Sequence, residues 1–176
     1  MLADELPRAA KLIGTTAPDT VVFGCTSAGS LEGLAHDARI RQTIEEAAGA
    51  KTITVLDAVM AELRRLNPRR VAVFTPYVED LTNRVASCVA EGGFEVVQSA
   101  GMGIRENLDI GRVTPEKIVG FVESHLTAAA DCLFLSCTNW RAVQATALLW
   151  SALAIPVVSS NQAAMAAITC WAESRA

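Results

Sequence analysis

The sequence has no long hydrophobic run, no excess of basic residues and few aromatic side chains. None of its apolar runs reaches the ~18 residues that a membrane-spanning helix needs. Lysine and arginine number 15 against 19 acidic residues, a net charge of −4, which argues against a nucleic-acid or anionic-membrane surface. The amino terminus starts acidic and lacks the basic and apolar regions of a secretory signal. We therefore expect a cytoplasmic protein that binds neither nucleic acid nor a membrane.

The cysteines and histidines do not form the patterns that indicate disulfides or zinc. Five cysteines without a Cys-X-X-Cys pair are typical of a reducing compartment rather than of a disulfide framework. The two histidines, His36 and His125, lie far apart in the sequence, so no dedicated zinc site is expected, and both are interpreted as solvent-exposed residues of helices. With 51% hydrophobic and 19% charged residues, the 176-residue chain is too apolar to be disordered.

Apolar strands alternate with helical segments along the chain. Strands are predicted at residues 19–24, 52–55, 70–75, 94–97, 131–136 and 155–159. Helices are predicted at residues 2–14, from about 30 to 49, and at 57–66, 76–91, 115–129, 140–153 and 161–171, with Thr114 as an N-cap. Short apolar strands that are each followed by a helix are typical of parallel sheets with helices on both faces. The predicted fold class is therefore α/β.

One pattern occurs twice. Residues 19–27 consist of Asp, an apolar strand and then Gly-Cys-Thr-Ser, and residues 131–139 consist of Asp, an apolar strand and then Ser-Cys-Thr-Asn. Ligands of open α/β sheets bind at the carboxyl ends of the strands, where both cysteines fall. Backbone N–H groups at the start of a helix stabilise a thiolate and also bind a carboxylate. Two such thiols facing one small substrate can act as nucleophile or base on one side and as acid on the other.

The alternative for each cysteine is a purely structural role, because free cysteine is among the most buried residue types. The repeated Cys-Thr-polar context favours a functional role for Cys25 and Cys137. The other three, Cys88, Cys132 and Cys170, lie within predicted helices or at a strand start and are interpreted as structural.

Further polar groups follow other strands. Tyr77, the only tyrosine, follows Thr75-Pro76, where its phenol can donate to a carboxylate or enolate oxygen, or can lie as an amphipathic ring on the surface. Residues 159–162 (Ser-Ser-Asn-Gln) offer hydroxyls and amides at a further strand end. The threonines, serine and asparagine after the two cysteines can cap helices, which is compatible with binding an anion.

Four segments together resemble the maleate isomerase and arylmalonate decarboxylase family of the Asp/Glu racemase superfamily. They are Cys25-Thr-Ser-Ala-Gly-Ser, Thr75-Pro-Tyr-Val-Glu-Asp-Leu-Thr-Asn-Arg-Val, Leu135-Ser-Cys-Thr-Asn and Pro156-Val-Val-Ser-Ser-Asn-Gln. The resemblance implies two Rossmann-like lobes related by a pseudo-twofold axis, an active site between them and no cofactor. We expect residues 1–67 with 159–176 to form the first lobe and residues 68–158 the second.

The resemblance also implies roles for individual residues. Cys25 would be the nucleophile of a maleate isomerase, and Cys137 would be the second catalytic cysteine. Substrate-binding residues would be Thr26, Ser27, Tyr77, Asn107, Thr138 and Asn139. The related decarboxylases typically have glycine in place of Cys25, so a pair of cysteines favours isomerase or racemase chemistry.

The family pattern begins with a strand–helix–strand unit that we do not find, so the first lobe is expected to be incomplete. The resulting hypothesis is a cofactor-independent cis–trans isomerase of a small unsaturated dicarboxylate, such as maleate, expected as a homodimer or larger homo-oligomer. Two alternatives stay open. One is a two-cysteine racemase or decarboxylase that acts at a carbon α to a carboxylate, and the other is a non-catalytic carboxylate-binding protein.

Overall fold

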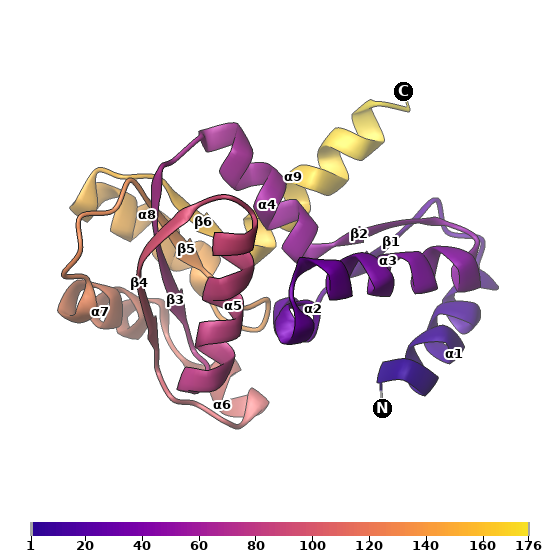
Figure 1. Cartoon of the computed structure of the whole chain (residues 1–176), viewed down its shortest axis with the longest axis horizontal. Coiled ribbons are helices and arrows are strands. Elements are labelled where there is room, and N and C mark those ends of the chain that lie inside the picture. The colour runs from indigo at the N-terminus through magenta and orange to yellow at the C-terminus, as the bar shows by residue number, and fades with distance from the viewer. Residues whose placement is uncertain (1, 176) are drawn as a thin grey trace.

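The computed structural model describes residues 2–175, in which helices and strands alternate (Figure 1). The strands are β1 (Thr20–Phe23), β2 (Lys51–Thr54), β3 (Arg70–Thr75), β4 (Glu95–Gly101), β5 (Cys132–Leu135) and β6 (Val157–Ser159). The helices are α1 (Leu2–Gly14), α2 (Thr26–Gly29), α3 (Leu34–Ala48), α4 (Val55–Leu66), α5 (Glu79–Glu91), α6 (Asn107–Arg112), α7 (Pro115–His125), α8 (Ala142–Leu153) and α9 (Ser160–Glu173), with a 3-10 turn η1 (Ser30–Glu32).

The strands form two separate parallel sheets. One sheet pairs β1 with β2, and the other has the order β4-β3-β5-β6. In Figure 1, α7 and α8 lie on the side of the four-stranded sheet opposite α5, while α3 runs along the two-stranded sheet, with α9 on its other side. The predicted α/β class is confirmed. Because every pair is parallel, the carboxyl ends of β3, β5 and β6 lie along one edge of their sheet.

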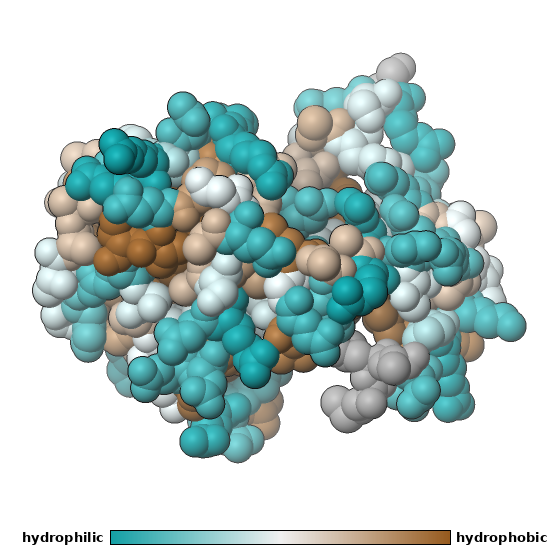
Figure 2. Space-filling view, viewed as in Figure 1, coloured by the Kyte–Doolittle hydropathy of each residue, from teal (hydrophilic) through white to brown (hydrophobic). Residues whose placement is uncertain are grey.

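The two sheets differ in how much core surrounds them. The main hydrophobic core encloses the four-stranded sheet and includes the fully buried Phe74, Phe134 and Trp140, and α4 packs into it through Leu56 and Met60. A second, much smaller cluster joins α1, α3 and β1 and consists of Ala10, Val21, Ile40, Ile44 and Ala48. The visible molecular surface is mostly hydrophilic, as Figure 2 shows. Helix α4 packs into the main core although it was expected to belong to the first lobe. The lobe boundaries expected after residues 67 and 158 stay a prediction.

Several predicted element boundaries were wrong. The helix expected from about residue 30 to 49 is divided into η1 and α3 by Gly33, whose φ of +81° is a left-handed conformation that favours glycine. The short helix α6 was not predicted, and α5 begins at Glu79 rather than at residue 76. Thr114 caps α7 as predicted, since its Oγ1 accepts from the N–H of Lys117. His125 is exposed, but His36 is half-buried, contrary to the prediction.

A buried carboxyl group lies beneath α2. Asp37 is only 4% exposed, and its Oδ2 accepts a hydrogen bond from the Thr54 hydroxyl. Its Oδ1 has no hydrogen-bond partner within residues 2–175 and lies against Gly29, where any β-carbon would collide with it. Burial raises the pKa of Asp37 above its ordinary value, and the nearby Asp57 acts in the same direction. The folded environment therefore stabilises the charged carboxylate less well than water does.

We expect Asp37→Asn to raise the free energy of unfolding at pH 8 by on the order of 1 kcal/mol, because the amide is uncharged at every pH. A carboxyl whose pKa is higher in the folded state contributes its full stability below its unfolded pKa and loses it as the pH rises through the folded pKa. Thermal unfolding at pH 4, 6 and 8 should therefore show the advantage of the variant shrinking toward pH 4. The exposed Asp57→Asn is the control. An Asp37→Asn variant that melts below the wild type at pH 8 would contradict this account.

Candidate active site between two cysteine turns

Cys25 stands in the turn between β1 and α2. It is the N-cap residue of α2, with extended backbone (φ −135°, ψ 96°), and its side chain is half-buried. Its Sγ lies 3.5 Å from the Oγ of Ser27. The next residue, Thr26, is fully buried, and its hydroxyl lies 3.1 Å from that of Ser160. Cys25 is therefore the accessible thiol of this turn, and Thr26 anchors the turn to the interior.

Cys137 stands in the corresponding turn after β5 but is more deeply buried, with 5% of its surface exposed. The thiol interacts with the hydroxyl of Tyr77 and with the backbone N–H groups of Asn139 and Trp140. These groups lower the pKa of Cys137, but burial, the largest effect, raises it above the ordinary value. Desolvation therefore outweighs the backbone N–H groups at this turn, and α8 begins only at Ala142.

Tyr77 links the two turns. Its side chain is 6% exposed, and its hydroxyl lies near Cys137, Cys25 and Ser27, close enough for all three to influence its pKa. Burial, the largest effect, raises the pKa of Tyr77 far above its ordinary value, and both cysteines act in the same direction. Tyr77 is therefore a neutral phenol. Cys25, Ser27, Tyr77 and Cys137 therefore lie close together, with the Cys25 Sγ in polar contact with Ser27.

The two cysteine turns are also connected below the thiols. The hydroxyl of Ser160, at the start of α9, accepts from the backbone N–H of Cys137 at 3.2 Å and lies 3.1 Å from the hydroxyl of Thr26. The hydroxyl of Thr138 donates to the carbonyl of Gly24 at 2.8 Å. These contacts place the segment before Cys25 directly against the segment after Cys137, although 114 residues separate them.

The remaining expected site residues lie at the periphery. Asn139 donates from Nδ2 to the backbone oxygen of Asn107 at 2.6 Å and to its Oδ1 at 2.9 Å, and both asparagines are exposed. The structure thus brings together Cys25, Ser27, Tyr77 and Cys137. Thr26 and Thr138 brace the two turns, whereas the asparagine pair lies at one side.

Sequence reasoning missed the central place of Ser160. Its signal was present, since residues 159–162 form another polar segment at a strand end. The position of Ser160 between both cysteine turns depends on β5 pairing with β6, which brings two strand ends together. Asn161 contributes as well, because its Nδ2 donates to the carbonyl of Thr138 at 3.0 Å.

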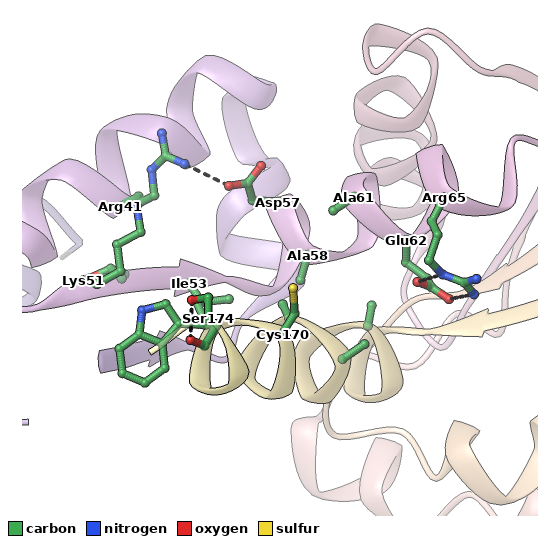
Figure 3. Close-up of a pocket in the computed structure, with 15 residues that line it drawn as sticks. Arg41, Lys51, Ile53, Asp57, Ala58, Ala61, Glu62, Arg65, Cys170 and Ser174 are labelled. Carbon is green, nitrogen blue, oxygen red and sulfur yellow. Dashed lines mark hydrogen bonds and ion pairs between the residues drawn. The ribbon is translucent and has the colours of Figure 1, made fainter. Parts of the chain in front are cut away.

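A cavity of about 470 Å³ lies elsewhere, between β2, α4 and α9 (Figure 3). Alanines of the two helices, with Ile53 and Trp171, form much of its wall, and Cys170 points into it. Two ion pairs lie along it, Arg41 with Asp57 at 2.9 Å and Arg65 with Glu62 at 2.7 Å, and Lys51 also lines it. This cavity contains none of the residues expected in the active site.

Over residues 2–175 no cluster of three or more histidine, cysteine or acidic side chains is arranged to hold a metal ion. Within the same part of the chain, no helix combines the length and the apolar character that crossing a membrane requires.

These observations define an α/β protein whose parallel sheets bring two cysteine turns and a buried tyrosine to one place. A model of the arylmalonate decarboxylase family matches residues 2–175. The chain belongs to this family, and the resemblance of the four sequence segments is thereby confirmed.

Individual relatives carry two activities. The chain is 31% identical over 140 residues to an arylmalonate decarboxylase of Bordetella bronchiseptica, covering 78% of the chain and 58% of the relative. It is 26% identical over 163 residues to a maleate isomerase of Geobacillus stearothermophilus, covering 89% of the chain and 65% of the relative. The chain therefore spans less than two thirds of the length of either relative.

Solved structures share the fold. The maleate isomerase Iso of Pseudomonas putida S16 superposes with a TM-score of 0.85 at 25% identity, over 97% of this chain and 71% of that one. A cysteine-to-serine variant of Nocardia farcinica maleate cis–trans isomerase, which holds a covalently bound succinylcysteine intermediate, superposes with a TM-score of 0.86 at 21% identity, over 92% and 69% of the two chains.

Proposed function

We propose that this chain catalyses the cis–trans isomerisation of a small unsaturated dicarboxylate of the maleate type, without a cofactor. The observation that carries the proposal is the grouping of Cys25, Ser27, Tyr77 and Cys137, in which an accessible thiol and a buried thiol lie near one phenol. Maleate isomerases among its relatives support the substrate class.

In the proposed reaction the Cys25 thiolate adds to one alkene carbon. A C–S bond forms, and the π electron pair moves onto the other alkene carbon and its carboxylate. The bond between the two carbons is then single and rotates. When the electron pair returns, the double bond forms again in the trans arrangement and the C–S bond breaks, so Cys25 is regenerated.

Cys137 and Tyr77 would stabilise the charge that develops during addition. Because its pKa is raised, Cys137 holds its proton and can donate it to the carbanion, which gives a succinyl thioether, and then take it back before elimination. Tyr77 is a neutral donor for the carboxylate that becomes enolate-like. The succinylcysteine intermediate in the Nocardia farcinica enzyme is the adduct that this chemistry produces.

The substrate carboxylates would be bound by neutral donors. Ser27 lies between Cys25 and Tyr77 and can donate from its hydroxyl. The backbone N–H groups and hydroxyls near Thr26 and Thr138, with the amides of Asn107 and Asn139, are the candidates for binding the second carboxylate. The accessible side is that of Cys25, because Tyr77 and Cys137 are almost fully buried.

The proposal predicts that the purified chain converts maleate to fumarate with no added cofactor. Proton NMR of the vinyl protons measures both isomers directly. A parallel sample that starts from fumarate defines the ratio of the two isomers at equilibrium. Heat-denatured protein and free cysteine at the same thiol concentration are the controls. The proposal would be overturned if the chain is folded by circular dichroism but converts maleate to fumarate no faster than free cysteine does.

A second candidate is proton transfer at a carbon α to a carboxylate, as in decarboxylation or racemisation. The 31% identical arylmalonate decarboxylase favours it, and so does the protonated Cys137, which can deliver a proton to an α carbon. Release of carbon dioxide from an arylmalonate, or deuterium uptake from D₂O into an amino acid without maleate turnover, would favour this alternative.

A further inference from the structure

We propose that Arg84 and Glu91 of α5 are positioning residues that hold the Cys25 turn in place beside Tyr77. The inference rests on the proposed function in one respect, namely that Cys25 is the nucleophile. Neither residue touches Cys25. They act on the segment from Ser30 to Leu34, which continues directly from α2.

The start of α5 is fixed relative to Tyr77. The helix begins two residues after Tyr77, with Val78 as its N-cap. The Oγ1 of Thr82 donates to the carbonyl of Val78 at 3.1 Å and lies 2.7 Å from the Oγ1 of Thr75. A β-carbon added at Gly101 would collide with the carbonyl of Tyr77 and with Thr82, so β4 closes this region from the other side. Movement of α5 therefore moves Tyr77.

One face of α5 contacts the chain that follows α2. Arg84 Nη1 donates to the carbonyl of Leu31, Cys88 Sγ donates to the carbonyl of Ser30 at 3.8 Å, and Glu91 Oε2 accepts from the N–H of Leu34 at 2.9 Å. Positions 84, 88 and 91 are spaced i, i+4 and i+7, which places them on one side of a helix. Figure 1 shows α5 facing α2 at the junction of the two sheets.

Glu91 supplies the hydrogen-bond acceptor that the N-cap residue of α3 lacks. The N-cap of α3 is Gly33, which has no side chain to accept from the free N–H groups of the first turn. Glu91 provides that acceptor from another helix, and its negative charge suits the amino terminus of a 15-residue helix. A β-carbon at Gly33 would lie 2.8 Å from Glu91 Oε2, so the glycine also makes room for the carboxylate.

The segment held by α5 is short and internally bonded up to Cys25. The N–H of Gly29 donates to the carbonyl of Cys25 at 3.3 Å, and the hydroxyl of Ser30 donates to the carbonyl of Ser27 at 3.1 Å. A restraint on residues 30–34 is therefore transmitted to Cys25 and Ser27 over two hydrogen-bonded turns. This restraint adds to the contacts that the Cys25 turn makes with Ser160 of α9, with Asp37 of α3 and with the second cysteine turn.

The test compares Glu91→Ala with Glu91→Gln and with Glu123→Ala, which removes an exposed glutamate of α7. Iodoacetamide labels the cysteines, and mass spectrometry gives the rate at each. Exposed Cys170 is the internal reference, and buried Cys132 reports loss of the fold. We expect the Cys25 to Cys170 ratio to rise at least about threefold in Glu91→Ala, and to stay near the wild-type value in Glu91→Gln, whose amide oxygen still accepts.

Turnover gives a second readout. We expect kcat for maleate in Glu91→Ala to fall by about tenfold with KM changed less, since the nucleophile is misplaced rather than the substrate lost. An unchanged labelling ratio in Glu91→Ala, or labelling of Cys132 in step with Cys25, would overturn the positioning role. If Glu91→Ala does not fold, Arg84→Met carries the same test. A wild-type chain without maleate turnover contradicts the proposed function, while the labelling ratios still decide the role of Glu91.

Discussion

Maleate turnover is expected to fall by at least about 10³-fold in Cys25→Ala, with the thermal midpoint of unfolding almost unchanged. The sulfur is the only group in the proposed reaction that forms a bond to the substrate, so alanine leaves no substitute. Little stability is lost, because the half-buried side chain has one polar contact, with Ser27 at 3.5 Å. The measurement is the initial rate of fumarate formation, together with a thermal melt of each protein.

The control for Cys25→Ala is Cys170→Ala, which removes an exposed thiol remote from both cysteine turns and should retain full activity. Loss of activity in both variants would indicate a general effect of thiol removal. Full activity in Cys25→Ala would exclude a mechanism through a Cys25 adduct. It would favour acid–base catalysis by Cys137 instead.

Tyr77→Phe is expected to lower kcat/KM for maleate by about 10²-fold, because the phenol is a neutral donor close to both thiols. The ring keeps its packing, so the free energy of unfolding should change by no more than about 1 kcal/mol. Steady-state rates and thermal melts measure the two effects separately.

The labelling rate of Cys25 distinguishes the possible roles of Tyr77. A phenol that serves only the substrate carboxylate leaves iodoacetamide labelling of Cys25 unaltered in Tyr77→Phe, while turnover falls. If Tyr77→Phe keeps the wild-type kcat/KM, the role of Tyr77 is packing alone. The phenol would then not be the donor that stabilises the negative charge formed during thiolate addition.

Much of the fold was predictable because apolar periodicity is a local property. The strand at 70–75 and the helix at 2–14 have the predicted bounds. The break at Gly33 was missed because helical periodicity does not record a single residue with positive φ. The short helix α6 was missed because its six residues carry too few apolar positions to show a period.

The site was predictable in part for a similar reason. A repeated strand–Cys–Thr pattern identified Cys25 and Cys137, since the carboxyl end of a parallel strand can be found from sequence. Their connection through Tyr77 and Ser160 depends on contacts between distant segments. The raised pKa of Cys137 depends on burial, which a motif does not contain.

The two sheets should differ in their local dynamics, because their hydrophobic cores differ in size. The Cys25 turn follows β1, a strand packed on a cluster of five small or medium side chains, whereas the Cys137 turn follows a strand buried in the main core. Local opening costs least where few apolar groups are buried, so amide protons around β1 should exchange with solvent before those of β5. The nucleophile would then belong to the part of the molecule that fluctuates, and the proton donor to the part that stays rigid.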